Sequence, residues 1–372
     1  MPSVFEISNS GMCNRKCAFC PRSDPNYEHN NEFNLADPGY QITFPKDHGP
    51  HKNFRIEWWY LTSNLKSESI ANLGIQWTLF KSNLTPTSSK KPNNLNSFWM
   101  AHSAITTDTL HYFEERFARE ESDQAGVKLD PFRAWIDNWS VTGDDRLETM
   151  QLESSGVDFA FSLKFSTKIK PVLQGNAGYS KKSETSAASH YYSQPFYNVE
   201  GWVTLNGERH VVEGVGWLDR EWSSNLLNKS QLGWDWFSLH LNDGRKVMLF
   251  KVRHASGNDF LSGSWINQDG TKKPLNASEI ELEEMSYSTV KGRKIPTKWK
   301  ISFLGRNGLT INTEALNIDS WMDTNFPYWE HLDSGLSLPL EQTATQQQLL
   351  LIPSAGHKEH LTSKHWKNST TY

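Results

Sequence analysis

The stretch YNVEGWVTLNGERHVVEGVGWLDREW, residues 197–222, decides the fold of this chain. Two runs rich in valine and tryptophan flank the pair Asn206-Gly207. Valine, tryptophan and threonine favour strands, and Asn-Gly favours the two-residue type I′ turn that joins antiparallel strands. The stretch therefore predicts a β-hairpin whose second strand runs through WLDREW.

Runs of the same kind recur along the chain, separated by turn pairs such as Asp243-Gly244 and Asp269-Gly270. They include RIEWWYLTSNL (55–65), NLGIQWTLFKS (72–82), FWMAHSAITT (98–107), FAFSLKFST (159–167), WDWFSLHL (234–241), KVMLFKVR (246–253) and WKISFL (299–304). Many short strands divided by turns are typical of an antiparallel meander. The chain is therefore predicted to be all-β, with its strands in up-and-down barrels or sandwiches.

The composition limits the classes of function that this protein can have. A length of 372 residues favours two domains. The net charge is −4 and no basic stripe appears, so nucleic acid is not expected as a partner. The 16 tryptophans, 19 phenylalanines and 11 tyrosines fit either a large aromatic β core or the walls of a site for a hydrophobic molecule.

The chain shows neither of the sequence signals for membrane insertion or export. No run of about 18 apolar residues is present, so no membrane span is expected. The N-terminus also lacks the cationic and apolar segments of a signal peptide. As written, the sequence predicts a cytoplasmic protein.

All three cysteines lie in one short motif, Cys13-x3-Cys17-x2-Cys20. The motif resembles that of the radical S-adenosylmethionine enzymes, which implies a [4Fe–4S] cluster and S-adenosylmethionine as cofactors. A zinc knuckle or a chance group of thiols are the alternatives. No amphipathic helices follow the motif, so residues 1–36 are predicted to be a loosely attached segment rather than a complete domain.

Three blocks together resemble the AttH-like family, which includes the carotenoid 1,2-hydratases, also called hydroxyneurosporene synthases. The blocks are FPKDHGPHKNFRIEWWY (44–60), ASHYYSQP (188–195) and GVGWLDREWSSN (214–225). The resemblance covers about residues 38–330. It implies two lipocalin-like β-barrel domains, with a site for a hydrophobic ligand in or between them.

We place these domains at residues 37–226 and 227–330, and by comparison with the family we expect the second domain to be incomplete. Beyond Glu330 the alternation of strands is lost. Residues 331–372 are therefore predicted to be an irregular tail, in which only LLLIP (349–353) could form a buried strand.

The WLDREW motif places two carboxylates on one face of a strand. Side chains at i and i+2 share a face, so Trp217, Asp219 and Glu221 point one way. Arg220 points the other way and cannot easily pair with them. If this face is buried, desolvation and like charge should raise the pKa of at least one carboxyl group. Such a group could donate a proton at neutral pH.

The resemblance implies particular roles for these residues. In the hydratase relatives a carboxylate follows a histidine by about 29 positions, as Asp219 follows His190 here. Asp219 would then protonate a C=C bond, and His190 would orient it or a water. Tyr192 and Trp217 would offer aromatic faces to the carbocation. Glu57 and Glu221 are further candidates for catalytic residues, and the β-barrel part needs no cofactor.

Other interpretations of the same residues remain open. The carboxylates could be structural ties, and the protein could be a non-catalytic carrier of a small hydrophobic molecule such as a carotenoid, another terpenoid or a polyketide. Asp47, His48 and His51 could suggest a metal site. The Gly-Pro pair between the two histidines favours a tight loop instead.

Overall fold

The computed structural model describes the chain from Phe33 onward with several gaps. The described residues are 33–84, 86, 97–120, 122–184, 187–225, 230–305, 309–332 and 344–352, and of 331–332 and 344–352 the backbone alone. Their regular elements are strands, apart from two short 3₁₀ turns, η2 (Lys46–His48) and η3 (Ala277–Glu279). None of the described helices is long and apolar enough to cross a membrane. The prediction of an all-β fold is confirmed.

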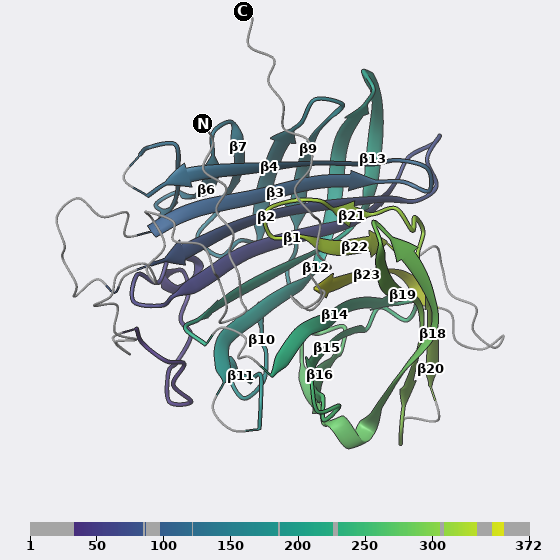
Figure 1. Cartoon of the computed structure of the whole chain (residues 1–372). Helices are drawn as coiled ribbons and strands as arrows, with labels where there is room; N and C mark the ends of the chain where they lie inside the picture. The colour runs from purple at the N-terminus through teal and green to yellow at the C-terminus, as the bar shows by residue number, and fades with distance from the viewer. Residues whose placement is uncertain are drawn as a thin grey trace, which may run out of the picture.

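Strands β1 to β13 form one thirteen-stranded sheet, called here the large sheet (Figure 1). They are β1 (Ile56–Lys66), β2 (Leu73–Asn83), β3 (Ser97–Thr106), β4 (His111–Arg119), β5 (Ala125–Leu129), β6 (Phe132–Ile136), β7 (Trp139–Gly143), β8 (Thr149–Ser155), β9 (Phe159–Ser166), β10 (Val172–Leu173), β11 (Tyr179–Lys181), β12 (Ala188–Leu205) and β13 (Glu208–Ser223).

The large sheet curls into a nearly closed barrel. Its order is β4-β3-β2-β1-β13-β12-β9-β8-β7-β6-β5, with β10 and β11 also paired to β12. The edge strand β4 comes back into contact with β6, which lies next to the opposite edge. Closing a sheet in this way hides the backbone groups that open edges would expose.

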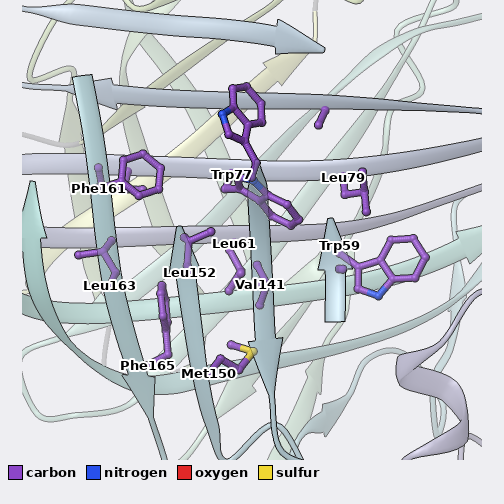
Figure 2. Close-up of a cluster of buried hydrophobic side chains, with 14 of the residues drawn as sticks. Trp59, Leu61, Trp77, Leu79, Val141, Met150, Leu152, Phe161, Leu163 and Phe165 are labelled. Atoms are coloured by element: carbon purple, nitrogen blue, oxygen red, sulfur yellow. The ribbon is translucent and has the colours of Figure 1, made fainter. Parts of the chain in front are cut away.

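Apart from β10 and β11, the strands of the large sheet fill the barrel with apolar side chains from one face (Figure 2). Trp59 and Leu61 on β1 alternate with residues of the other face, and Trp77 and Leu79 do the same on β2. Burial of each such side chain contributes about 1.5–3 kcal/mol. The period-2 pattern of the sequence thus specifies which face is inside.

The predicted hairpin is formed by β12 and β13. Asn206 and Gly207 have φ angles of 51° and 85°, as a type I′ turn requires, and Leu205 pairs with Glu208 across it. The register shifts once, between Gln194 and Tyr197. This β-bulge decides which side chains meet at the site described below.

Strands from β14 onward form two further sheets. A seven-stranded sheet, called here the second sheet, has the order β17-β16-β15-β14-β23-β22-β21, and a three-stranded sheet has the order β18-β19-β20. These strands are β14 (Gln231–Leu241), β15 (Lys246–His254), β16 (Phe260–Ile266), β17 (Lys272–Leu275), β18 (Ile280–Val290), β19 (Arg293–Phe303), β20 (Thr310–Glu314), β21 (Trp321–Met322), β22 (Tyr328–Leu332) and β23 (Ala344–Ile352). One apolar core lies between the two sheets.

The structure places a strand, β23, inside the segment that was predicted to be an irregular tail. β23 lies beyond Glu330 and pairs antiparallel with both β14 and β22. It includes the LLLI segment, and it supplies the ladder partners that β14 and β22 would otherwise lack. The chain passes from the large sheet to the second sheet between β13 and β14, which is near the predicted domain boundary. The division into two domains itself stays a prediction.

The outer face of the large sheet packs against the second sheet. Tyr60 and Trp217 join Trp236, Met248 and Phe250 in one buried cluster. In the same region β22 contacts β2, and β23 contacts β1 (Figure 1). The packed faces of the two sheets are called here the intersheet layer.

We expect substitution of Gly214 by alanine to destabilise the large sheet. A Cβ atom at Gly214 would lie 2.0 Å from the carbonyl oxygen of Asn64 on β1. The backbones of β1 and β13 would have to separate, at a cost of about 1–3 kcal/mol. Chemical denaturation measures the loss, and Val211→Ala is the control because Val211 is 79% exposed on the same strand. Equal stability of Gly214→Ala and the control would contradict the close approach.

Candidate functional site

Asp219 lies in the intersheet layer, in the C-terminal half of β13. It sits directly opposite Ser193 on β12 and Tyr60 on β1. Its side chain is buried, and Oδ1 accepts hydrogen bonds from the Ser193 hydroxyl at 2.5 Å and the Tyr191 hydroxyl at 2.8 Å. The strand register thus holds the carboxyl group in one orientation.

Burial raises the pKa of Asp219 to about 7. The hydrogen bonds from Ser193 and Tyr191 act in the opposite direction because they favour the ionised form, and the nearby Glu221 carboxylate adds to the increase. A carboxyl group with this pKa is partly protonated at neutral pH. It can therefore give and take a proton under the same conditions.

Aromatic rings surround this carboxyl group on the side of the second sheet. The indole N–H of Trp236 donates to the Tyr191 hydroxyl at 3.3 Å. The Trp236 ring lies edge-on to Trp217 and Tyr60, with centroid distances of 6.3 and 5.7 Å. The faces of such rings, unlike their edges, attract positive charge on a ligand.

A second carboxyl group enters the layer from β22. The Tyr60 hydroxyl donates to Oε1 of Glu330 at 2.7 Å, and both side chains are buried. Tyr60 also lies close enough to Asp219 for both carboxylates to raise the pKa of its phenol, after burial as the first cause. Tyr60 therefore stands between two acidic groups that come from different sheets.

A row of polar side chains crosses the outer face of the large sheet. Consecutive ladder partners are Ser193, Asp219, Tyr60, Thr78, His102 and Glu115. At its far end, His102 Nε2 lies 3.0 Å from Glu115, and Nδ1 lies 2.9 Å from the Tyr328 hydroxyl of β22. The row links the buried Asp219 to Glu115, whose side chain is 14% exposed.

The opposite face of β13 carries a separate network of charges at one end of the barrel. Arg220 donates to Oε2 of Glu57 at 2.5 Å and to the Gly49 carbonyl at 2.6 Å, and it stacks on Trp59 at 3.8 Å. His51 lies 3.2 Å from Glu57 and 3.2 Å from Asp47. The network fastens the segment around η2 to the barrel.

The charges of this network stabilise its carboxylates. Burial alone would raise the pKa of Glu57, but Arg220 and His51 outweigh it and lower the pKa to about 2. The pKa of Asp47 is also about 2, because hydrogen bonds from His51, Tyr40 and Thr43 outweigh its burial. Carboxylates held ionised in this way are structural partners rather than proton donors.

A model of the AttH-like family matches residues 35–335. The chain belongs to the AttH-like family. The crystal structure of an AttH protein from Nitrosomonas europaea superimposes with a TM-score of 0.75 at 25% identity, and the match covers 86% of this chain and 99% of that one. The lipocalin-like fold that the resemblance implied is thereby confirmed.

Two enzymes also resemble this AttH-like chain. Kievitone hydratase from Nectria haematococca has a TM-score of 0.63 at 13% identity, over 87% of this chain and 97% of that one, and so shows a shared fold. The dehydratase asqC from Emericella nidulans is 26% identical over 101 residues. That stretch is 26% of this chain and 27% of the curated relative, well under two thirds of its length.

The structure brings together only part of the predicted site of this AttH-like chain. Trp217, Asp219 and Glu221 share one face, as predicted, and Glu221 pairs there with Lys182 at 2.8 Å and with Ser189. Arg220 lies on the other face and pairs with Glu57, which was predicted only as a further candidate for catalysis.

His190 and Tyr192 do not meet Asp219, so the predicted proton-handling pair is not assembled. In the register of β12 and β13 they oppose Trp222 and Arg220, on the barrel side of the sheet. His190 Nε2 accepts from the Asp37 backbone N–H at 3.3 Å, and burial lowers the pKa of His190 to about 4. The Tyr192 hydroxyl lies 2.7 Å from His48 Nδ1.

The β-bulge explains why Tyr191 and Ser193, rather than His190 and Tyr192, lie beside Asp219. An uninterrupted register from the Asn206-Gly207 turn would place Gln194 opposite Asp219, with Tyr192 and His190 on the same face. The shift between Gln194 and Tyr197 places Ser193 there instead, with Tyr191 beside it. Pro195 is the signal in the sequence, because proline cannot donate to a ladder and marks bulges.

The residues considered for metal binding serve other purposes where the structure describes them. Asp47 accepts hydrogen bonds from Tyr40 and Thr43, both at 2.6 Å, and His48 contacts Tyr192. Within the described ranges, no three His, Cys, Asp or Glu side chains gather in a metal-binding group. Cys13, Cys17 and Cys20 lie outside the described residues, so the cluster and S-adenosylmethionine stay predictions.

Proposed function

We propose that this AttH-like protein adds water to, or removes it from, a C=C bond of a small hydrophobic molecule, with Asp219 as the proton donor. One observation carries the proposal: a buried carboxyl group whose pKa is about 7 lies among aromatic rings. The chemistry needs no cofactor, because the carboxyl group supplies the proton and water supplies the oxygen.

In the proposed hydration, the O–H bond of Asp219 breaks as the π electrons of the alkene form a C–H bond. The neighbouring carbon becomes a cation, which Trp217, Trp236 and Tyr60 stabilise with their aromatic faces. A water adds to this carbon and returns a proton to the Asp219 carboxylate. The hydroxyls of Tyr191 and Ser193 hold that carboxylate while it is ionised. Dehydration is the reverse sequence.

The names of the relatives support this class of reaction, since one is a hydratase and another a dehydratase. The motifs of the carotenoid 1,2-hydratases favour a linear isoprenoid as the substrate. The aromatic layer also suits a non-catalytic carrier, which is the second candidate. The two differ in whether the bound molecule is chemically changed.

The test is turnover of a panel of linear carotenoids and shorter terpenoids in water labelled with ¹⁸O. We expect a product that carries one labelled hydroxyl group, detected by mass spectrometry. The rate should fall as the pH rises through about 7, because Asp219 must be protonated to donate. Binding of the panel, followed by absorbance, without any labelled product would favour the carrier instead.

A further inference from the structure

Two basic residues lie in the intersheet layer beyond the residues that the proposed reaction uses. His240 on β14 and Lys246 on β15 are direct ladder partners on the face turned toward the large sheet. The His240 ring lies edge-on to Trp217 at 5.8 Å, and Lys246 Nζ lies 5.5 Å from the Phe196 ring. They are only 5% and 8% exposed.

These side chains lack the partners that buried polar groups require. Within the described ranges, Lys246 makes no hydrogen bond or ion pair, and Nδ1 of His240 has no hydrogen-bond partner. The hydroxyls of Ser238 and Ser264, which flank Met248 in the adjoining ladder row, are also buried without a partner. Folded proteins pair nearly all such groups, so four donors on one face indicate a bound acceptor.

The charge of this group fits a monoanion. Burial lowers the pKa of His240 well below its ordinary value, so the ring is neutral. Burial lowers the pKa of Lys246 to about 8, although the Asp243 carboxylate, which pairs with Arg245, acts in the opposite direction. At neutral pH the group therefore offers one positive charge together with neutral donors. Lys182 also faces this layer, but Glu221 neutralises it at 2.8 Å. A carboxylate matches this charge better than a diphosphate would.

Trp217 connects the basic pair to the proposed site. Its ring packs edge-on against both His240 and Trp236, and the Trp236 indole N–H donates to the hydroxyl of Tyr191, which in turn donates to Asp219. We propose that Lys246 and His240 bind the carboxylate of an amphipathic acid whose apolar body lies along Trp217 and Trp236. The proposal names amphipathic acids as the ligand class of the site. It rests on the proposed function only in placing the apolar part of the ligand near Asp219.

A matched pair of probes tests the proposal: cis-parinaric acid and its methyl ester, both titrated by fluorescence at pH 7. We expect the acid to bind more tightly than the ester. Lys246→Met should weaken binding of the acid by about 10–100-fold, the range for one charge-assisted hydrogen bond, and leave the ester unchanged. Lys246→Arg should keep part of the preference.

Lys272→Met is the control, because burial also lowers the pKa of Lys272 to about 8 while its Nζ donates to the carbonyls of Leu173 and Gly175. It should not change the ratio of acid to ester affinity. In the wild-type protein, ¹³C reductive methylation should show the pKa of Lys246 rising when the acid binds and not when the ester does.

Three results would overturn the proposal. The first is that the wild-type protein does not bind the acid more tightly than the ester, or binds neither probe. The second is that Lys246→Met weakens binding of both probes equally. The third is that the pKa of Lys246 does not change when the acid binds. These readouts do not involve Asp219. Absence of hydration activity with a preserved preference for the acid would therefore refute the proposed reaction and leave the carboxylate site standing.

Discussion

Asp219→Asn should lower the rate of hydration or dehydration by about 10²–10⁴-fold, the usual contribution of a general acid. Asparagine keeps the size of the side chain and an oxygen that can accept from Tyr191 and Ser193. It removes the transferable proton and the group whose pKa is about 7. The measurement is single-turnover kinetics on whichever substrate of the panel gives labelled product.

The same experiment separates catalysis from binding and from stability. Affinity for the unreacted substrate should change little, because the aromatic rings supply most of the binding. Replacing a buried ionisable group by a neutral amide should not lower the melting temperature. Glu213→Gln is the control for β13, because Glu213 pairs on the surface with Lys66. Full turnover by Asp219→Asn would remove the general acid from the proposal.

The hairpin, and which side chains of a strand share a face, could be predicted from the sequence, because turn type and side-chain alternation depend only on neighbouring residues. The Asn206-Gly207 turn and the alternation in WLDREW fixed the hairpin and the shared face of Trp217, Asp219 and Glu221. Neither pattern depends on distant parts of the chain. The family blocks added the lipocalin-like architecture, and the similarity to the crystal structure of an AttH protein confirms it.

The partners of these residues could not be predicted, since they depend on distant strands and on one bulge. Glu330 reaches Tyr60 across a separation of 270 residues, and nothing near either residue indicates that contact. Tyr191 replaces Tyr192 beside Asp219 because the register shifts by one residue. A shift of one residue in a strand moves every side chain to the other face.

Disruption of the charge network around Arg220 and Glu57, at one end of the barrel, should strongly lower the stability of the fold. Arg220→Met should lower the free energy of unfolding by about 3–5 kcal/mol, because it leaves the buried Glu57 carboxylate without its cation. Urea denaturation at pH 7 measures the loss. Adding Glu57→Gln should restore part of it, because the uncompensated charge is then gone. Lys164→Met is the control and should cost about 1 kcal/mol or less, since its pair with Glu200 is exposed.

The pH dependence of stability provides an independent check on the same network. The pKa of Glu57 is about 2 in the folded protein, below its ordinary value of 4.5, so the folded state favours the ionised form. The stabilisation is therefore complete above about pH 4.5 and is lost as the pH falls toward 2. In Arg220→Met the cation that lowers this pKa is absent, and burial should raise the pKa instead. The variant should then gain stability, relative to the wild type, as the pH falls from 7 toward 4. Parallel pH profiles for the two proteins would show that Arg220 does not control the charge of Glu57.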